Sequence, residues 1–364
     1  MENFVDLYTD YLICSFGQAT ATGLSQLLDG SISHDKITRG LSGHEYDSKY
    51  LWNFVKPMVG ELTTSKETIV LSFDDSIEEK QYSDESELIC WHYDHVFGRN
   101  VRGVNFLTAL VEVGNMRLPC AVEFVKKNVW ETDEKTGKKK RKSSKTKNEY
   151  YREMITQCHQ NFRFDYVCND CWFSSVENMK LVKEVLKSNF VMALKSNRKV
   201  ALSFADKQAK KYVSIESLQP GQQTVEIWLE ELDFPLLLVK QVFKNEDDTV
   251  GELYLACSDL SLQYGQITTI YKKRWGVEEY HKSVKSNASF AKSPAHTVRT
   301  QCNHFMLSIL AYVKLEWLNQ RTGKNHFAMK SKMYHAAVKA AYCEFKKLST
   351  PNRSEPVFFT GKAA

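Results

Sequence analysis

The spacing of apolar residues changes several times along the chain. Up to about residue 65, apolar side chains recur every three or four positions, which predicts helices. From about residue 66 the period shortens, and the nearly continuous apolar run over 68–73 predicts a buried strand. The apolar stretches 106–113 and 118–125, separated by Gly114 and Asn115, predict a β-hairpin.

Helical and strand-like stretches alternate further along. The pattern predicts a helix over 148–159, a strand over 164–168, a helix over 176–187 and a strand over 190–194. Short strand-like runs follow, and from 267 to about 347 the period is helical again. This order is typical of a mixed α/β chain. We expect five regions: a helical region (1–65), a core in two parts (66–197 and 257–296) interrupted by a β-rich insertion (198–256), and a C-terminal helical region (297–364).

Composition narrows the class of protein only a little. The 364 residues are enough for two or three domains, and a hydrophobic content of 43% predicts a globular interior. The net charge of +5 is too small to indicate a nucleic-acid partner by itself. No basic segment followed by an apolar run opens the sequence, and no stretch approaches the roughly 20 apolar residues of a membrane span. We therefore expect a cytoplasmic protein.

The nine cysteines do not form a metal-binding pattern. Only Cys168 and Cys171 have C-x-x-C spacing, and no second pair lies at zinc-finger distance. Because most of the cysteines have apolar neighbours, we interpret them as reduced core residues. His92, Asp94 and His95 lack a further set of ligands, and we interpret them as polar groups near a crevice or at a sheet edge.

The N-terminal region contains one candidate DNA-binding motif. A short helix over 20–30, a turn, and a second helix from His34 with exposed polar and basic residues are typical of a helix-turn-helix. Lys36 and Arg39 on the second helix are its candidate DNA contacts. A small helical hairpin with no role in DNA binding would give the same pattern.

A second basic segment lies in the middle of the chain. The lysine-rich tract 126–147, which includes Lys139, Lys140 and Arg141, is too polar to pack and predicts a flexible loop. Such a loop is either simply solvated or a contact for DNA phosphates.

Three carboxylates are candidates for metal-dependent chemistry. Asp74 and Asp170 each stand at the predicted C-terminal end of a hydrophobic strand, where side chains enter a crevice in an α/β sheet. Glu278 lies on a predicted helix, within a ~60° arc of one face that also carries Tyr271, Arg274 and Lys285. The Arg274–Glu278 pair alone would be an ordinary exposed ion pair. Together, however, the three carboxylates could hold two hard divalent cations against a phosphate.

The order of these residues resembles a known family. Tyr271-x2-Arg274-x3-Glu278-x6-Lys285 is similar to the Y-R-E-K signature of a large group of bacterial insertion-sequence DDE transposases. Asp74, two residues before Ser76, resembles the first-aspartate motif of that group, and Asp170 resembles the second. Asp75 is an alternative to Asp74, which we prefer for its Asp-x-Ser spacing.

The resemblance implies a fold, a reaction and partners. It implies an RNase H-like catalytic core with a β-rich insertion, and Asp74, Asp170 and Glu278 as catalytic residues that hold two Mg²⁺ ions, with Mn²⁺ able to substitute. It further implies cleavage at the ends of an insertion sequence and strand transfer by the 3′-hydroxyl, within a homodimeric synaptic complex on nucleoid DNA. Tyr271, Arg274 and Lys285 would contact DNA near the cleaved phosphate.

Two other functions remain open at this stage. An RNase H-like nuclease or junction resolvase would use the same chemistry, although such enzymes usually lack a large insertion. A non-catalytic DNA-binding protein derived from a transposase would have no reason to keep three mutually repelling acids. We interpret His281, one turn after Glu278, as a solvated helix histidine.

Overall fold

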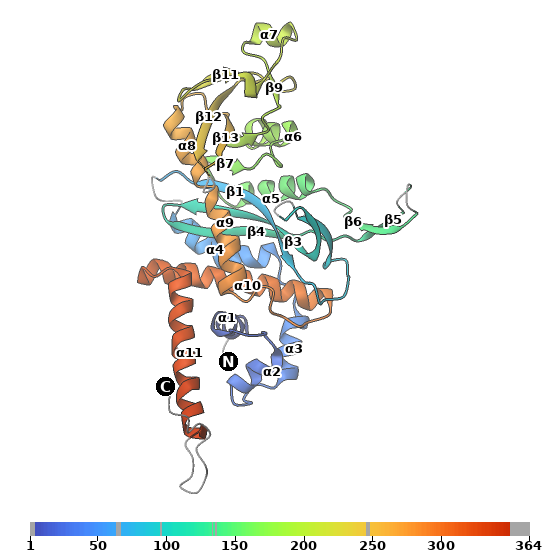
Figure 1. Cartoon of the computed structure of the whole chain (residues 1–364), viewed down its shortest axis with the longest axis vertical. Helices are drawn as coiled ribbons and strands as arrows, with labels where there is room; N and C mark the ends of the chain where they lie inside the picture. Colours follow the sequence, from blue (N-terminus) through green and yellow to red (C-terminus); the bar gives the residue numbers. More distant parts are fainter. Residues whose placement is uncertain are drawn as a thin grey trace, which may run out of the picture.

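The computed structural model describes residues 4–62, 67–94, 97–132, 134, 137–244 and 248–349 (Figure 1). The predicted boundary at 65–66, His95 and residues 350–364 therefore lie outside the described residues. The fold is mixed α/β, as predicted, with helices on both faces of one large sheet. The helices are α1 (Phe4–Cys14), α2 (Ala21–Leu27), α3 (His34–Gly43), α4 (Ser48–Leu62), α5 (Lys147–Asn161), α6 (Val176–Lys180), α7 (Phe204–Gln208), α8 (Tyr264–Lys272), α9 (Trp275–Asn287), α10 (Val298–Thr322) and α11 (His326–Ser349), with a π-helical turn η1 (Leu181–Val185) and a 3₁₀ turn η2 (Ile215–Ser217).

The main sheet has nine strands in the order β11-β12-β13-β8-β7-β1-β3-β2, with β4 also paired to β3. Its central pairs β1–β7 and β7–β8 are parallel, and the other pairs are antiparallel. The strands are β1 (Val70–Glu79), β2 (Cys90–Asp94), β3 (Arg99–Val113), β4 (Met116–Phe124), β7 (Tyr166–Asn169), β8 (Asn189–Leu194), β11 (Val225–Ile227), β12 (Leu236–Lys244) and β13 (Val250–Cys257). The short pairs β5 (Val129–Thr132) with β6 (Lys139–Lys142) and β9 (Lys199–Val200) with β10 (Val213–Ser214) lie apart from it.

The β-rich stretch predicted over 198–256 contributes to the main sheet. Strand β13 pairs with β8 through Tyr254↔Leu194 and Cys257↔Val191, and β12 and β11 follow at the edge. The sheet therefore continues without interruption from the predicted core into the predicted insertion. The division of the chain into domains stays a prediction.

The strand β1 is longer than the sequence predicts. The apolar run was expected to end at Asp74, but β1 extends to Glu79 because β3 pairs with it along its whole length, from Val70↔Glu112 to Glu79↔Gly103. Asp74 therefore lies in the middle of a strand rather than at its end, and this part of the prediction is wrong. The hairpin predicted at Gly114 and Asn115 is present as β3 and β4.

Helices cover the two faces of the sheet in a way that follows from strand alternation. Phe73 packs against the ring of Tyr151 on α5, with ring centroids 4.5 Å apart. The neighbouring residue Asp74 therefore points to the opposite face, where α8 and α9 lie. Phe106 on β3 packs there against His281 of α9. The carboxylate of Asp74 and the helix that carries Glu278 thus lie on the same side of the sheet.

The N-terminal helices pack beneath the sheet, beside α10 (Figure 1). Helices α2 and α3 form a small hairpin in which Ser33 caps α3, and Ile37 and Leu41 of α3 are buried. Lys36 and Arg39 are exposed on the same helix. This arrangement is compatible with a helix-turn-helix, and its role in reading DNA stays a prediction.

The lysine-rich tract predicted as a flexible loop contains a β-hairpin. Strands β5 and β6 pair in register from Val129↔Lys142 to Thr132↔Lys139, and they project from the body of the molecule (Figure 1). Every position of β6 is charged, so the pattern of apolar residues could not reveal that strand. Backbone pairing with β5 holds it in place. Within the described parts of the chain, every helix is too short or too polar to span a bilayer.

Candidate active site

Asp74 and Asp170 lie next to each other because of the parallel register of two strands. The last paired residues of β1 and β7 are Phe73 and Asn169, so the next residue on each strand is an aspartate. Adjacent strands are about 4.8 Å apart, and residues in register share a face. The two carboxylates, separated by almost 100 positions in the sequence, therefore start from neighbouring backbone positions.

Glu278 reaches this face from the first turn of α9, but not in the way that the sequence predicts. The prediction of one continuous helix from Tyr271 to Lys285 is wrong, because α8 ends at Lys272 and α9 begins at Trp275. At the junction, the N–H groups of Lys273, Arg274 and Val277 each donate to a carbonyl three residues earlier. The tighter turns rotate α9 relative to α8 and leave Glu278 one turn into the new helix.

The electrostatics of the site show that the acidic groups converge. Burial, followed by the charges of Asp75, Asp170 and Glu278, raises the pKa of Asp74 to about 8, against the lowering effect of Arg274. Burial also raises the pKa of Asp170, an effect opposed by the N–H of Trp172, which donates to its Oδ1 at 2.9 Å. Carboxylates that repel one another in a partly buried crevice favour a proton or a cation between them.

Arg274 is the cation that faces the acidic cluster. Its guanidinium donates to Glu278 at 2.6 Å and lies over the ring of Tyr271, 5.6 Å from the centroid. Burial lowers the pKa of Arg274, but Tyr271, Glu278 and Asp74 outweigh this and raise it. Tyr271 itself is buried, and burial raises its pKa. The structure therefore brings together five predicted residues, Asp74, Asp170, Tyr271, Arg274 and Glu278, with Glu278 turned toward Arg274.

Asp75 is engaged on the opposite face of the sheet. Its Oδ2 accepts from Asn105 at 2.7 Å and from Lys147 of α5 at 2.6 Å. Asp74, in contrast, accepts the N–H of Asp75 at 2.9 Å and faces Asp170 and Glu278. This difference favours Asp74 over Asp75 as the first aspartate of the site.

Lys285 and His281, which follow Glu278 on α9, are placed differently from the prediction. Lys285, predicted to contact DNA, donates to the carbonyl of Ile77 at 2.6 Å and pairs with Glu78 at 3.3 Å. His281, interpreted as a solvated histidine, is instead buried against Phe106, and burial lowers its pKa to about 3. Both side chains fix α9 to the sheet, which the sequence of the helix alone could not reveal.

Gly276 is a residue of the site that the sequence analysis missed. A Cβ at this position would lie 2.4 Å from Oε2 of Glu112 and 2.9 Å from Nε of Arg117, which form an ion pair at 2.8 Å on β3 and β4. Only glycine lets the first turn of α9 approach this pair so closely. The Trp-Gly step that follows Arg274 in the sequence is the only local signal for it.

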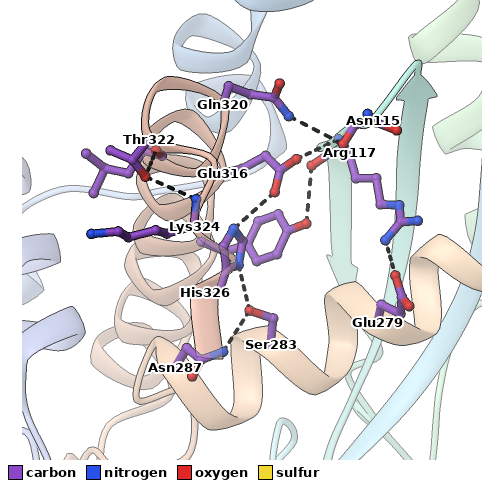
Figure 2. Close-up of polar contacts among 12 residues, drawn as sticks. Asn115, Arg117, Glu279, Ser283, Asn287, Glu316, Gln320, Thr322, Lys324 and His326 are labelled. Atoms are coloured by element: carbon purple, nitrogen blue, oxygen red, sulfur yellow. Dashed lines mark hydrogen bonds and ion pairs between the residues drawn. The ribbon is translucent and has the colours of Figure 1, made fainter. Parts of the chain in front are cut away.

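Further polar contacts hold the rest of α9 in place (Figure 2). Arg117 of β4 pairs with Glu279, and His326 of α11 lies between Ser283 of α9, at 2.8 Å, and Glu316 of α10, at 3.0 Å. Ser283, Glu316 and His326 are all buried. These contacts connect α9 to β4, α10 and α11, so the position of Glu278 depends on residues from four elements.

The predicted basic contacts lie away from the carboxylates. Lys139 and Lys140 are exposed on β6, whereas Arg141 lies over the ring of Trp130 at 4.3 Å and pairs with Glu85 at 3.7 Å. The structure does not bring these residues, or Lys36 and Arg39, into contact with the acidic cluster. Their role in binding DNA stays a prediction.

The donor set fits a hard divalent cation, but its side chains are not yet gathered around one point. In the described part of the chain, no three His, Cys, Asp or Glu side chains are close enough to hold a metal ion as they stand. The reason is visible in the contacts: Glu278 is turned to Arg274, and Asp170 to the N–H of Trp172. Oxygen ligands and an unfavourable cluster of negative charge are nevertheless what such a cation requires.

Comparison with known families decides the class of protein. The model of the family described as "Archaeal putative transposase ISC1217" matches residues 66–326, well over half of the chain. The chain belongs to this transposase family. The matched segment includes Asp74, Asp170 and Glu278 and ends at His326. Curated proteins give no match to this transposase. Among solved structures, it is similar to the Drosophila P element transposase strand transfer complex, with 8% identity and a TM-score of 0.28 over 97% of this chain and 88% of that chain.

Proposed function

We propose that this transposase cleaves the ends of an insertion sequence and transfers the freed 3′-hydroxyl to target DNA, using Asp74, Asp170 and Glu278. The observation that carries the proposal is the register of β1 and β7, which sets Asp74 beside Asp170 on the face covered by the helix that carries Glu278. The family match supports a transposase over an unrelated α/β enzyme.

The strand order supports an RNase H-like core. Strands β4, β3 and β1 are antiparallel neighbours, and β7 and β8 continue the sheet in parallel with β1. Three antiparallel strands followed by two parallel ones is the arrangement of the RNase H fold, in which the first strand and the fourth carry acidic residues side by side. Strands β11 to β13 then correspond to the proposed insertion.

Asp74, Asp170 and Glu278 would hold two metal ions. The proposed ions are Mg²⁺, for which Mn²⁺ could substitute. Two such ions stabilise the attacking and leaving oxygens of an in-line phosphoryl displacement. Among the chain's own groups, Asp74 has to lose its proton, because burial and its acidic neighbours keep its pKa near 8. Glu278 has to turn away from Arg274, and this frees the guanidinium to bind a phosphate beside the site.

The proposed partners are the terminal inverted repeats of the element and target DNA, within a homodimeric synaptic complex. Tyr271 and Arg274 are the proposed DNA contacts nearest to the carboxylates. Lys285 is proposed as a further contact only if its bonds to Ile77 and Glu78 exchange for phosphate.

Cleavage of labelled DNA tests the proposal. The substrate carries the DNA sequences from either side of the gene, where terminal inverted repeats are expected, and the reaction is run with Mg²⁺, with Mn²⁺ and with a chelator. Glu278→Gln should abolish both cleavage and joining, whereas Glu184→Gln, on an exposed helical turn, should not change either. Thermal unfolding of each variant checks that it is folded.

The outcomes separate the candidate functions. Full activity of Glu278→Gln would overturn the assignment of the site. Nicking of branched DNA without any joining would favour the nuclease or resolvase alternative. Binding of the repeats with no cleavage under any metal condition would favour the non-catalytic alternative.

A further inference from the structure

A group of exposed aromatic residues lies at the end of the sheet where β2 pairs with β3. Trp91 and Tyr93 are two residues apart on β2, so they share one face, and they are 53% and 52% exposed. Trp91 lies opposite Arg102 in the register of β2 and β3, and the Arg102 guanidinium is 5.9 Å from the centre of the indole. An exposed tryptophan with an arginine over its ring combines an aromatic plane with a cation.

The projecting hairpin repeats this arrangement. Trp130 on β5 lies opposite Arg141 on β6, is 57% exposed, and has the Arg141 guanidinium 4.3 Å from its ring centre. Lys127 connects the two places: its Nζ donates to the carbonyl of Trp91 at 2.5 Å, and its own carbonyl accepts from Arg141 at 3.5 Å. We define Trp91, Tyr93, Arg102, Trp130 and Arg141 as the aromatic platform.

Charge and geometry indicate the kind of ligand that the aromatic platform fits. Arg141 pairs with Glu85, so the platform offers less positive charge to phosphates than its arginines alone suggest. Its distinctive features are ring and guanidinium planes, on which unpaired bases stack. Bases within a duplex are already stacked on one another and present no free face. The chemistry therefore favours unpaired nucleotides over duplex DNA.

The platform also lies within reach of the proposed active site. Thr108, the partner of Asp74 in β3, is six residues from Arg102, about 20 Å along the strand. At the duplex rise of about 3.4 Å per nucleotide, this distance corresponds to about six nucleotides, and an extended unpaired strand covers it with fewer. Arg102 and Thr108 are an even number of residues apart and so point to the same face of β3.

We propose that the aromatic platform binds single-stranded DNA by base stacking, holding unpaired nucleotides close to the cleavage site. This inference rests on the proposed function, since it names a part of the DNA substrate of the same site. Stacking on an aromatic side chain changes affinity by about tenfold or more per base. The affinity it supplies depends weakly on salt, because stacking releases few counterions.

Binding of a fluorescently labelled oligothymidylate tests the platform. The oligonucleotide has about 12 nucleotides, within the ~4–16-nucleotide range of known single-strand sites, and fluorescence anisotropy is measured on the full chain in a chelator, so that no cleavage occurs. Trp91→Ala and Trp130→Ala should each weaken binding about tenfold. Trp91→Phe, which keeps an aromatic ring, should retain most of the affinity. That result would show that the loss of affinity in Trp91→Ala comes from the missing ring and not from misfolding.

A matched control comes from another exposed tryptophan–arginine pair. Trp317 on α10 is 43% exposed and has the Arg321 guanidinium 4.5 Å from its ring centre, but it lies outside the platform. Trp317→Ala should bind the oligonucleotide as the unmodified chain does. An abasic oligonucleotide of equal length should bind weakly and should be insensitive to Trp91→Ala.

The results separate this inference from the proposed function. Three results would overturn the platform: unchanged affinity in both Trp91→Ala and Trp130→Ala, equal binding of the abasic strand, or no binding of single strands at all. The last of these would point to a protein partner for this surface. If Glu278→Gln keeps cleavage activity while the platform variants lose binding, the proposed active site fails and the platform stands.

Discussion

The carboxylate site and the hairpin β5–β6 differ in how their charged groups are exposed to water. Asp74 and Asp170 are set side by side by a strand register and partly buried, and burial together with neighbouring acidic charge raises the pKa of each. Lys139 and Lys140 are exposed on a projecting hairpin. Because gathering acids out of water costs free energy and exposing lysines costs almost none, the acidic cluster is much stronger evidence of function than the basic tract.

The largest expected effect distinguishes the two adjacent aspartates of β1. Asp74→Asn should lower the rate of cleavage by more than ~100-fold, because even groups that merely support a metal ligand contribute about 10–100-fold. Asp75→Asn should lower it by about tenfold or less, since Asp75 faces Asn105 and Lys147 on the other side of the sheet. Single-turnover cleavage with Mg²⁺ measures both rates. A reversed order of effects would identify Asp75 as the first aspartate.

The second prediction concerns the cost of burying Asp74 without a metal. In the folded chain its pKa is about 8, compared with an ordinary value of 3.8, so the folded state holds a proton that the unfolded state has lost between these pH values. The free energy of unfolding should therefore fall as pH rises from about 4 to 8. Asp74→Asn should flatten this dependence and stabilise the metal-free chain at pH 8 by on the order of 2 kcal/mol, a figure reduced for partial exposure.

Urea unfolding in a chelator at several pH values checks this result, with Glu184→Gln as the control that should leave the pH profile unchanged. Added Mg²⁺ should restore stability at pH 8 in the unmodified chain more than in Asp74→Asn. If the unmodified chain and Asp74→Asn show parallel pH profiles of stability, burial of Asp74 does not destabilise the metal-free chain. The contrast between the carboxylate site and the hairpin β5–β6 then loses its basis.

The sequence was sufficient for the parts of the fold that depend on local pattern. The hairpin at Gly114 and Asn115 follows from two apolar runs and a turn, and Asp170 follows from the end of β7. The length of β1 could not be predicted in the same way, because its second half is polar and is held by its partner β3. The charged strand β6 of the basic hairpin was missed for the same reason, since its partner β5 holds it.

The geometry around Glu278 shows where local pattern stops being informative. The apolar period runs through Tyr271 to Lys285 without a break, yet the helix divides at Lys273 and Arg274. The cause is tertiary: Gly276 packs on an ion pair from β3 and β4, and His281 is buried against Phe106. The spacing of the signature residues was therefore informative about the family, while the single continuous helix inferred from it was wrong.

A third, smaller effect tests whether the acidic site needs this close packing. Gly276→Ala should destabilise the chain by roughly 1–3 kcal/mol, because its Cβ would overlap the Glu112–Arg117 pair. Cleavage should fall as well, since α9 carries Glu278. Gly265→Ala, in α8 with no atom within 4 Å of the added Cβ, should instead be neutral or stabilising by roughly 0.5–1 kcal/mol. Equal effects of the two substitutions in thermal unfolding would argue against a packing role for Gly276.

The smallest effect is expected at the hairpin, and it decides whether the exposed lysines bind DNA. If Lys139 and Lys140 each contact a phosphate, replacing both by glutamine should reduce the slope of log affinity against log salt by about two for duplex DNA, because each contact contributes ~0.9. The double substitution of the exposed Lys210 and Lys211 is the control and should leave the slope unchanged. Trp130→Ala, on the same hairpin, should also leave the duplex slope unchanged, since stacking releases few counterions. An unaltered slope after loss of both Lys139 and Lys140 would mean that the hairpin's lysines are simply solvated, and that its contribution to DNA binding comes from the ring of Trp130 rather than from its charge.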